Sequence, residues 1–155
     1  DYISVDADSD TRRDASGEDW MGYRIQTRAS PTSSVSQASQ ALPAAPTTLK
    51  TIGVYINIYQ QCCERYDVLF LAPPGMIETD FLGAEVRRVG WGRKLREEYA
   101  FREGFPFDPR DTPHAVVEID TDRGLIQLVP YNDHNGYYPH DMNVQWEDYE
   151  DIQRL

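Results

Sequence analysis

Alternating apolar and polar positions predict the first strand at residues 51–59. Isoleucine or valine occupies every second position from 52 to 58, and polar, glycine or tyrosine residues lie between them. A period of two is typical of a strand with one buried face. The uninterrupted apolar run over residues 67–72 predicts a fully buried strand, which ends at a Pro-Pro-Gly turn.

The clearest pattern is a hairpin over residues 114–130. Residues 114–120 alternate polar and apolar side chains, residues 125–130 form another apolar run, and a turn with glycine at its last position lies between them. We therefore expect two antiparallel neighbours. Residues 85–91 predict a further short strand. Residues 93–103 are rich in helix formers and predict a helix that buries Leu95 and Tyr99, four positions apart.

Composition divides the chain into two parts near residue 48. Residues 29–48 consist almost wholly of Ala, Ser, Pro, Thr and Gln, without charge or aromatic residues, which is typical of a linker. We therefore expect an acidic N-terminal arm and linker over residues 1–48, and a single α+β domain with an acidic C-terminal tail over residues 49–155. The predicted class is α+β: a mainly antiparallel sheet of four or five strands, one packed helix and an irregular N-terminal arm.

Net charge narrows the classes of function. The 155 residues include 26 acidic and 15 basic side chains, a net charge of −11, and the acids gather at both ends of the chain. A nucleic-acid-binding protein needs a basic face, so this class is disfavoured. No apolar run is long enough to span a membrane. The adjacent Cys62 and Cys63 do not indicate a disulfide framework, because neighbouring cysteines cannot easily close a normal disulfide. The chain begins at Asp1 rather than at methionine, so we expect either an exported, processed protein or an excised fragment.

Histidines in the last third of the chain form the first candidate catalytic site. His134 and His140 lie in a predicted loop over residues 131–141, and His114 begins the first strand of the hairpin. If this loop folds back over the polar face of the strand, the histidines and neighbouring carboxylates would suit acid–base catalysis or a divalent metal. No known metal-ligand spacing is present. A polar turn with surface histidines explains the same residues.

A second candidate catalytic site rests on residues 23–28, Tyr-Arg-Ile-Gln-Thr-Arg. This segment resembles the Tyr-Arg-x-x-Ser-Arg start of the A chains of cholera- and pertussis-type ADP-ribosyltransferase toxins. The resemblance implies that Arg24 helps bind NAD. It also implies that Glu147 is catalytic, because residues 145–147 have the form of the family's late Gln-x-Glu motif. The family's Ser-Thr-Ser strand has no match in the strand that starts at Thr51.

Aromatic and acidic residues gather near the end of the chain and form a candidate partner-binding site. Tyrosine and tryptophan are favoured at interfaces because they combine an apolar body with a polar tip. An acidic rim around them suits a basic partner. Closing the core is the alternative role for these aromatic rings. The candidate residues are Tyr137, Tyr138, Trp146, Asp148, Tyr149 and Glu150.

Two classes of function therefore remain open. The first hypothesis is a small acidic, exported domain of the effector or inhibitor type that acts by binding another protein. The alternative is a toxin-type enzyme, either an NAD-dependent ADP-ribosyltransferase or a hydrolase that uses the histidines and their neighbouring carboxylates. The two classes differ in geometry, because an enzyme brings its reactive groups together in one cleft.

Overall fold

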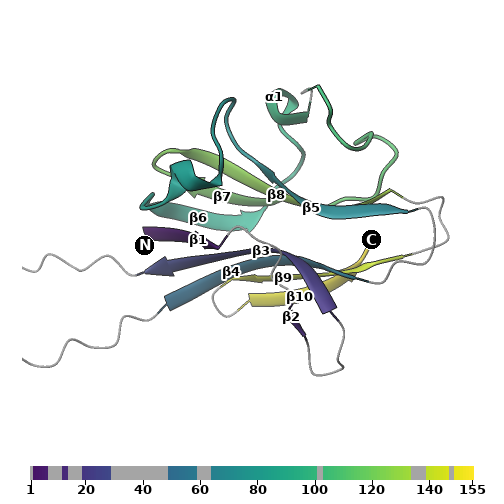
Figure 1. The fold of residues 1–155 in the computed structure, drawn as a ribbon, viewed down its shortest axis with the longest axis horizontal. Helices are drawn as coiled ribbons and strands as arrows, with labels where there is room; N and C mark the ends of the chain where they lie inside the picture. Colours follow the sequence, from purple (N-terminus) through teal and green to yellow (C-terminus); the bar gives the residue numbers. More distant parts are fainter. Residues whose placement is uncertain are drawn as a thin grey trace, which may run out of the picture.

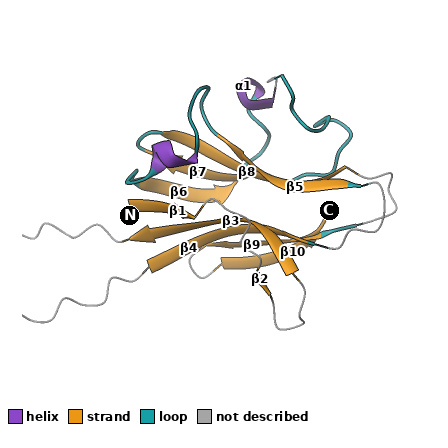
Figure 2. Ribbon diagram, in the orientation of Figure 1, coloured by secondary structure: helices purple, strands orange, loops and turns teal. Residues whose placement is uncertain are grey.

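Two antiparallel β-sheets packed face to face make up the fold (Figure 1). A computed structural model of the chain describes residues 2–6, 12–13, 19–28, 49–58, 64–100, 103–133, 139–146 and 149–155. Every pair of neighbouring strands within them is antiparallel. Figure 2 shows how little of these residues is helical.

The first sheet takes its strands from both ends of the chain. Its order is β1-β3-β4-β9-β10, and β2 also pairs with β3. Its strands are β1 (Tyr2–Asp6), β2 (Arg12–Arg13), β3 (Asp19–Arg28), β4 (Leu49–Asn57), β9 (Asp141–Trp146) and β10 (Tyr149–Arg154). The second sheet has the order β5-β8-β7-β6. Its strands are β5 (Arg65–Leu71), β6 (Val86–Trp91), β7 (Val117–Thr121) and β8 (Gly124–Asp133).

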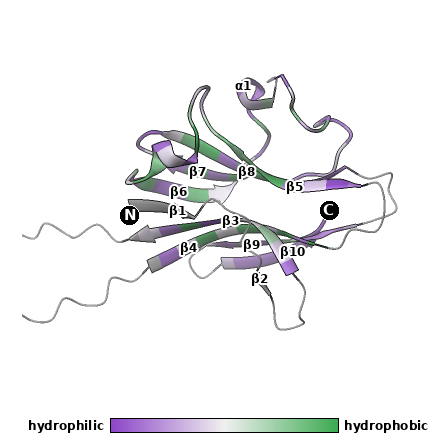
Figure 3. Cartoon of the chain, in the orientation of Figure 1, coloured by the Kyte–Doolittle hydropathy of each residue, from purple (hydrophilic) through white to green (hydrophobic). Residues whose placement is uncertain are grey.

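The main hydrophobic core lies between the two sheets. Period-two alternation turns Ile52, Val54 and Ile56 of β4 toward the second sheet, and Ile119 and Ile126 of β7 and β8 belong to the same buried cluster. Figure 3 shows hydrophobic residues on strands of both layers. Burial of this apolar surface provides most of the driving force for packing the sheets together.

A second, smaller core covers the outer face of the second sheet. The segment after β6 crosses this face and contains the helix α1 (Glu97–Ala100), which Figure 1 shows on the side away from the first sheet. Leu95, Tyr99 and Phe107 from this segment pack against Val129 and Tyr131 of β8. The strands β5 and β8 therefore contribute side chains to both cores. This explains why their apolar runs are nearly continuous in sequence.

The strands expected in the middle of the chain are confirmed. The predicted strands at residues 51–59, 67–72 and 85–91 correspond to β4, β5 and β6. The strand β5 is not fully buried as expected, because Leu69 and Phe70 are only half-buried. The predicted hairpin corresponds to β7 and β8, joined by a turn in which Thr121 pairs with Gly124. The first hairpin strand begins at Val117 rather than at His114, whose backbone forms only an isolated bridge with Tyr131.

The expected class needs correction at three points. The chain forms two sheets instead of one sheet of four or five strands. The expected helix over residues 93–103 has only four helical residues in α1 among those described. Leu95 and Tyr99 are buried as expected, but side-chain hydrogen bonds from the second sheet hold the segment before α1. A short 3₁₀ helix, η1 (Glu78–Phe81), lies between β5 and β6.

The third correction concerns the N-terminal arm, which is not irregular over residues 19–28. These residues form β3, which pairs with β4 from Trp20 to Arg28. The boundary expected near residue 48 thus falls between two hydrogen-bonded neighbours of one sheet. Gly22 makes this pairing possible, because a Cβ atom on it would lie 2.0 Å from the carbonyl oxygen of Val54. The predicted linker over residues 29–48 lies outside the described residues.

Candidate functional site

An aromatic cluster joins the edges of the two sheets. Its members are Trp91 at the end of β6, Trp146 at the end of β9 and Tyr149 at the start of β10, and we call them the edge aromatic cluster. The rings of Trp146 and Tyr149 are stacked with centroids 4.5 Å apart, and Trp91 meets Trp146 edge-on at 5.7 Å. The indole N–H of Trp91 donates a 3.0 Å hydrogen bond to the Tyr149 hydroxyl. The structure therefore brings together Trp146 and Tyr149, two of the predicted partner-binding residues.

The strand β10 carries exposed apolar and acidic side chains next to this cluster. It is the last strand of its sheet and pairs only with β9 among the described strands. Ile152 is 59% exposed and Tyr149 is 38% exposed. Glu150 accepts a 2.9 Å hydrogen bond from Asn143, and Asp151 accepts one of 2.6 Å from Gln153. The carboxylates are thus held along an edge strand whose outer backbone side has no strand partner among the described residues.

A cleft of about 1130 Å³ lies beside the edge aromatic cluster. Its walls come from the segment after β6, from the loop after α1 and from the start of the hairpin, and Trp91 and Gln153 connect it to the cluster. Leu95, Phe107 and Val116 are buried in its wall. The charged lining residues are Arg93, Lys94, Glu97, Asp108 and Arg110.

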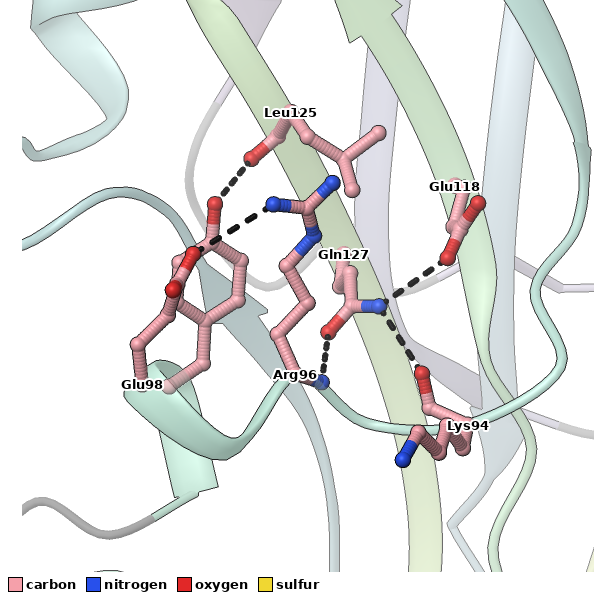
Figure 4. A network of polar contacts seen from close by, with 7 residues as sticks. Lys94, Arg96, Glu98, Glu118, Leu125 and Gln127 are labelled. Carbon is pink, nitrogen blue, oxygen red and sulfur yellow. Dashed lines mark hydrogen bonds and ion pairs between the residues drawn. The ribbon is translucent and has the colours of Figure 1, made fainter.

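The side chain of Gln127 fixes one wall of this cleft (Figure 4). Gln127 lies on β8 and is fully buried. Its amide oxygen accepts a hydrogen bond from the backbone N–H of Arg96, and its amide nitrogen donates to the carbonyl oxygen of Lys94 and to Glu118, all at 3.1 Å. The Tyr99 hydroxyl donates to the carbonyl oxygen of Leu125 at 2.9 Å. These bonds tie the segment that carries Lys94 to the sheet beneath it.

The cations of the cleft differ in their pairing. Arg110 donates to Asp108 at 2.7 Å, and these hydrogen bonds lower the pKa of the Asp108 carboxyl to about 2. The charge of Arg110 is therefore compensated within the cleft. Among the described residues, the side chains of Arg93 and Lys94 form no ion pair. Both are exposed.

His114 lines the same cleft. Its Nδ1 lies 2.8 Å from the carbonyl oxygen of Thr112, and because a carbonyl only accepts, Nδ1 is the donor. In the neutral ring this leaves Nε2 as the acceptor. The ring packs 5.3 Å from Phe107, which stacks on Tyr131 at 4.5 Å. Burial raises the pKa of Tyr131, and the nearby charge of Asp67 adds to the effect.

His140 lies in a different environment, between the two sheets. Its Nε2 is 3.1 Å from the carboxylate of Glu64, and neither side chain is exposed. Its Nδ1 is 3.0 Å from the carbonyl oxygen of Asn57, and its ring stacks on Tyr66 at 4.0 Å. Burial, followed by the charge of Glu64, raises the pKa of Tyr66. Tyr66 packs against the inner core, so His140 and His114 lie on opposite faces of the second sheet and share no site.

The remaining candidate residues are only partly placed. Arg24 lies on β3, half-buried, with its guanidinium Nε inside the protein. Glu147, its counterpart in the transferase resemblance, lies outside the described residues. So do other predicted residues: Cys62, Cys63, His134, Tyr137, Tyr138 and Asp148. Within the part of the chain that the structure describes, no three His, Cys, Asp or Glu side chains gather as a metal site.

Sequence reasoning missed several residues of these sites. Lys94 falls in the helix expected over residues 93–103, and Phe107 falls outside every predicted element. The sequence around each of these residues has no pattern that would distinguish the wall of a cleft from an ordinary surface segment. Gln127 did carry a signal, because it is the one polar residue in the apolar run over residues 125–130. A buried amide in such a run needs hydrogen-bond partners from another segment.

Comparison with known proteins finds no matching family model, no matching curated protein and no matching solved structure. No helix among the described residues is long and apolar enough to cross a membrane. The candidate function therefore depends on the geometry of the edge aromatic cluster, β10 and the cleft.

Proposed function

We propose that this protein acts by binding another protein, as a small acidic domain of the effector or inhibitor type. The contact surface is β10 together with the edge aromatic cluster, and the partner presents a basic surface. The observation that carries the proposal is the stacked pair of Trp146 and Tyr149, beside the exposed carboxylate of Glu150 on an edge strand. Interfaces are enriched in such aromatic anchors, and they are depleted in charge at the centre but polar at the rim.

The pre-formed geometry of the cluster supports this role. The stacking with Trp146 and the hydrogen bond from Trp91 already hold the ring of Tyr149 in place. A side chain that is ordered before binding loses less conformational entropy when a partner covers it. Glu150 and Asp151 are likewise hydrogen-bonded to neighbouring side chains. A basic partner therefore meets a surface that needs little rearrangement.

Charge complementarity explains the choice of a basic partner. Residues 141–155 contain five acids and one base, a net charge of −4. An acidic edge attracts a basic surface and speeds the encounter, an effect that salt weakens. We expect neutralisation of Asp148, Glu150 and Asp151 together to slow association, with a smaller effect on dissociation. Unchanged association kinetics would rule out the charge-driven part of the proposal.

The proposal can be tested with a matched pair of exposed isoleucines. Ile152 on β10 is 59% exposed and Ile77, in the loop before η1, is 58% exposed. The immobilised chain captures proteins from an extract, and the affinity of each purified captured protein is then measured. We expect Ile152→Ser and Tyr149→Ala to weaken binding about tenfold, and Ile77→Ser to leave it unchanged. Equal binding by all variants would place the interface elsewhere.

A further inference from the structure

We propose that the cleft is a binding site for a small amphipathic anion, an organic carboxylate with an apolar body. This inference goes beyond the proposed protein-binding function, because it concerns a different ligand and other residues. Three properties of the cleft carry it: an apolar wall, a local charge opposite to that of the chain, and a backbone that is held in place at Lys94.

The apolar wall provides the contact for the body of the ligand. Leu95, Phe107 and Val116 lie in the wall with 5–7% of their surface exposed, and Phe105 lies half-buried beside Phe107 at a ring distance of 4.8 Å. Ligand sites in proteins are mostly apolar concavities with a small number of polar groups that fix orientation. The volume of about 1130 Å³ is slightly above the usual range for small-molecule sites.

The charge of the lining selects an anionic head group. Among the residues that the structure describes, the cleft is lined by three cations and two anions, a local net charge of +1: Arg93, Lys94, Arg110, Glu97 and Asp108. The whole chain has a net charge of −11. Because Arg110 is paired with Asp108, the cations left for a ligand are Arg93 and Lys94. A carboxylate is a natural partner for both of these groups.

The contrast between local and overall charge also selects a small ligand. At physiological ionic strength, charges further apart than about 8 Å are largely screened from each other. A small anion inside the cleft therefore responds mainly to the lining residues. An acidic macromolecule would extend over many acidic side chains of this chain and would be repelled by them. The observations favour a small carboxylate over an acidic protein segment.

The cleft is also organised before any ligand binds. Gln127 holds the backbone at Lys94 and Arg96, and the buried side chain of Leu95 anchors the residue between them. The His114 ring is held by its bond to Thr112. Fixed walls reduce the entropy that binding must remove.

The test is calorimetric titration of the full chain with decanoate, a carboxylate attached to a straight apolar hydrocarbon chain. Acetate carries the same head group without the body, and decyltrimethylammonium carries a similar body with a positive charge. We expect decanoate to bind, and the other two probes to bind at least about tenfold more weakly. Equal binding of decyltrimethylammonium would overturn the assignment of an anionic ligand. No binding of decanoate would overturn the site itself.

Variants locate the binding within the cleft. We expect the double substitution Arg93→Gln and Lys94→Gln to weaken decanoate binding about tenfold or more, because charge-assisted contacts are lost. Phe105→Ala should weaken it as well. The control is Arg87→Gln, which removes an exposed arginine of β6 that does not line the cleft. Equal affinity in the double variant and the control would overturn the proposal. Neither result depends on the protein partner of β10.

Discussion

Replacing Gln127 with methionine should destabilise the protein, because the buried amide of Gln127 joins the cleft wall to the second sheet. Methionine has a similar length but cannot make the three hydrogen bonds to Arg96, Lys94 and Glu118. A typical intramolecular hydrogen bond contributes about 1 kcal/mol net, so the loss is about 3 kcal/mol. For a domain of this size, each kcal/mol corresponds to about 2–4 °C in Tm, so we expect a fall of about 6–12 °C.

The assay is equilibrium unfolding in urea, followed by fluorescence and circular dichroism, for the wild type, Gln127→Met and Gln153→Leu. Gln153 is exposed on β10 and serves as the control, with an expected change within about 0.5 kcal/mol. Hydrogen exchange supplies a local readout, since the Arg96 amide should lose protection in Gln127→Met. A loss below about 1 kcal/mol with an unchanged Arg96 amide would refute the role assigned to Gln127.

Other predictions follow from the backbone, the buried pair and the cleft. Gly22→Ala should lower the free energy of unfolding, measured in urea, by about 3 kcal/mol, because a Cβ atom there would overlap β4. A stability equal to that of the wild type would contradict the strand spacing. Glu64→Ala should cost about 1–3 kcal/mol, because it removes the buried carboxylate beside Nε2 of His140. The double variant with His140→Ala should lose less than the two single losses added together. The Asp108 carboxyl should titrate at a pKa of about 2 by NMR, below its ordinary 3.8, and Arg110→Gln should return it toward 3.8. A depressed carboxyl pKa stabilises the fold above the ordinary pKa, so this contribution is lost as the pH falls from 3.8 toward 2. An unchanged titration in Arg110→Gln would contradict the pairing.

Hydrophobic periodicity predicted the strands whose apolar faces are buried. The alternation around Val54 reports one buried face, and the near-continuous run around Leu128 reports burial on both faces. Both patterns depend only on which side chains are buried in the fold, so they can be recognised in the order of apolar and polar residues.

The strands that the sequence analysis missed are stabilised in other ways. In β10, every side chain is exposed except that of Asp151, which is half-buried. The strand therefore has no buried apolar face, and its sequence shows no alternation from which a strand could be predicted. Its backbone bonds to β9 hold it in place. In β9, Met142, Val144 and Trp146 do alternate, but the acidic residues around them favoured an acidic C-terminal tail over a strand. The helix is shorter than expected because Gln127, which lies far along the chain, forms hydrogen bonds with the backbone of the residues before α1. Such tertiary contacts override local propensity.

The two sheets differ in how far apart their paired strands lie along the chain. This difference determines the order in time in which the sheets are completed. The second sheet comes from residues 65–133 alone, whereas the first sheet pairs β4 with β9 across that whole stretch. Short-range pairings form faster, because closing a long loop costs more entropy before any contact compensates it. We therefore expect the second sheet to be complete before the first sheet during synthesis. The core that holds Ile119 and Ile126 then lacks Met142 and Val144, and is open to aggregation, until the residues of β9 and β10 arrive and complete the first sheet.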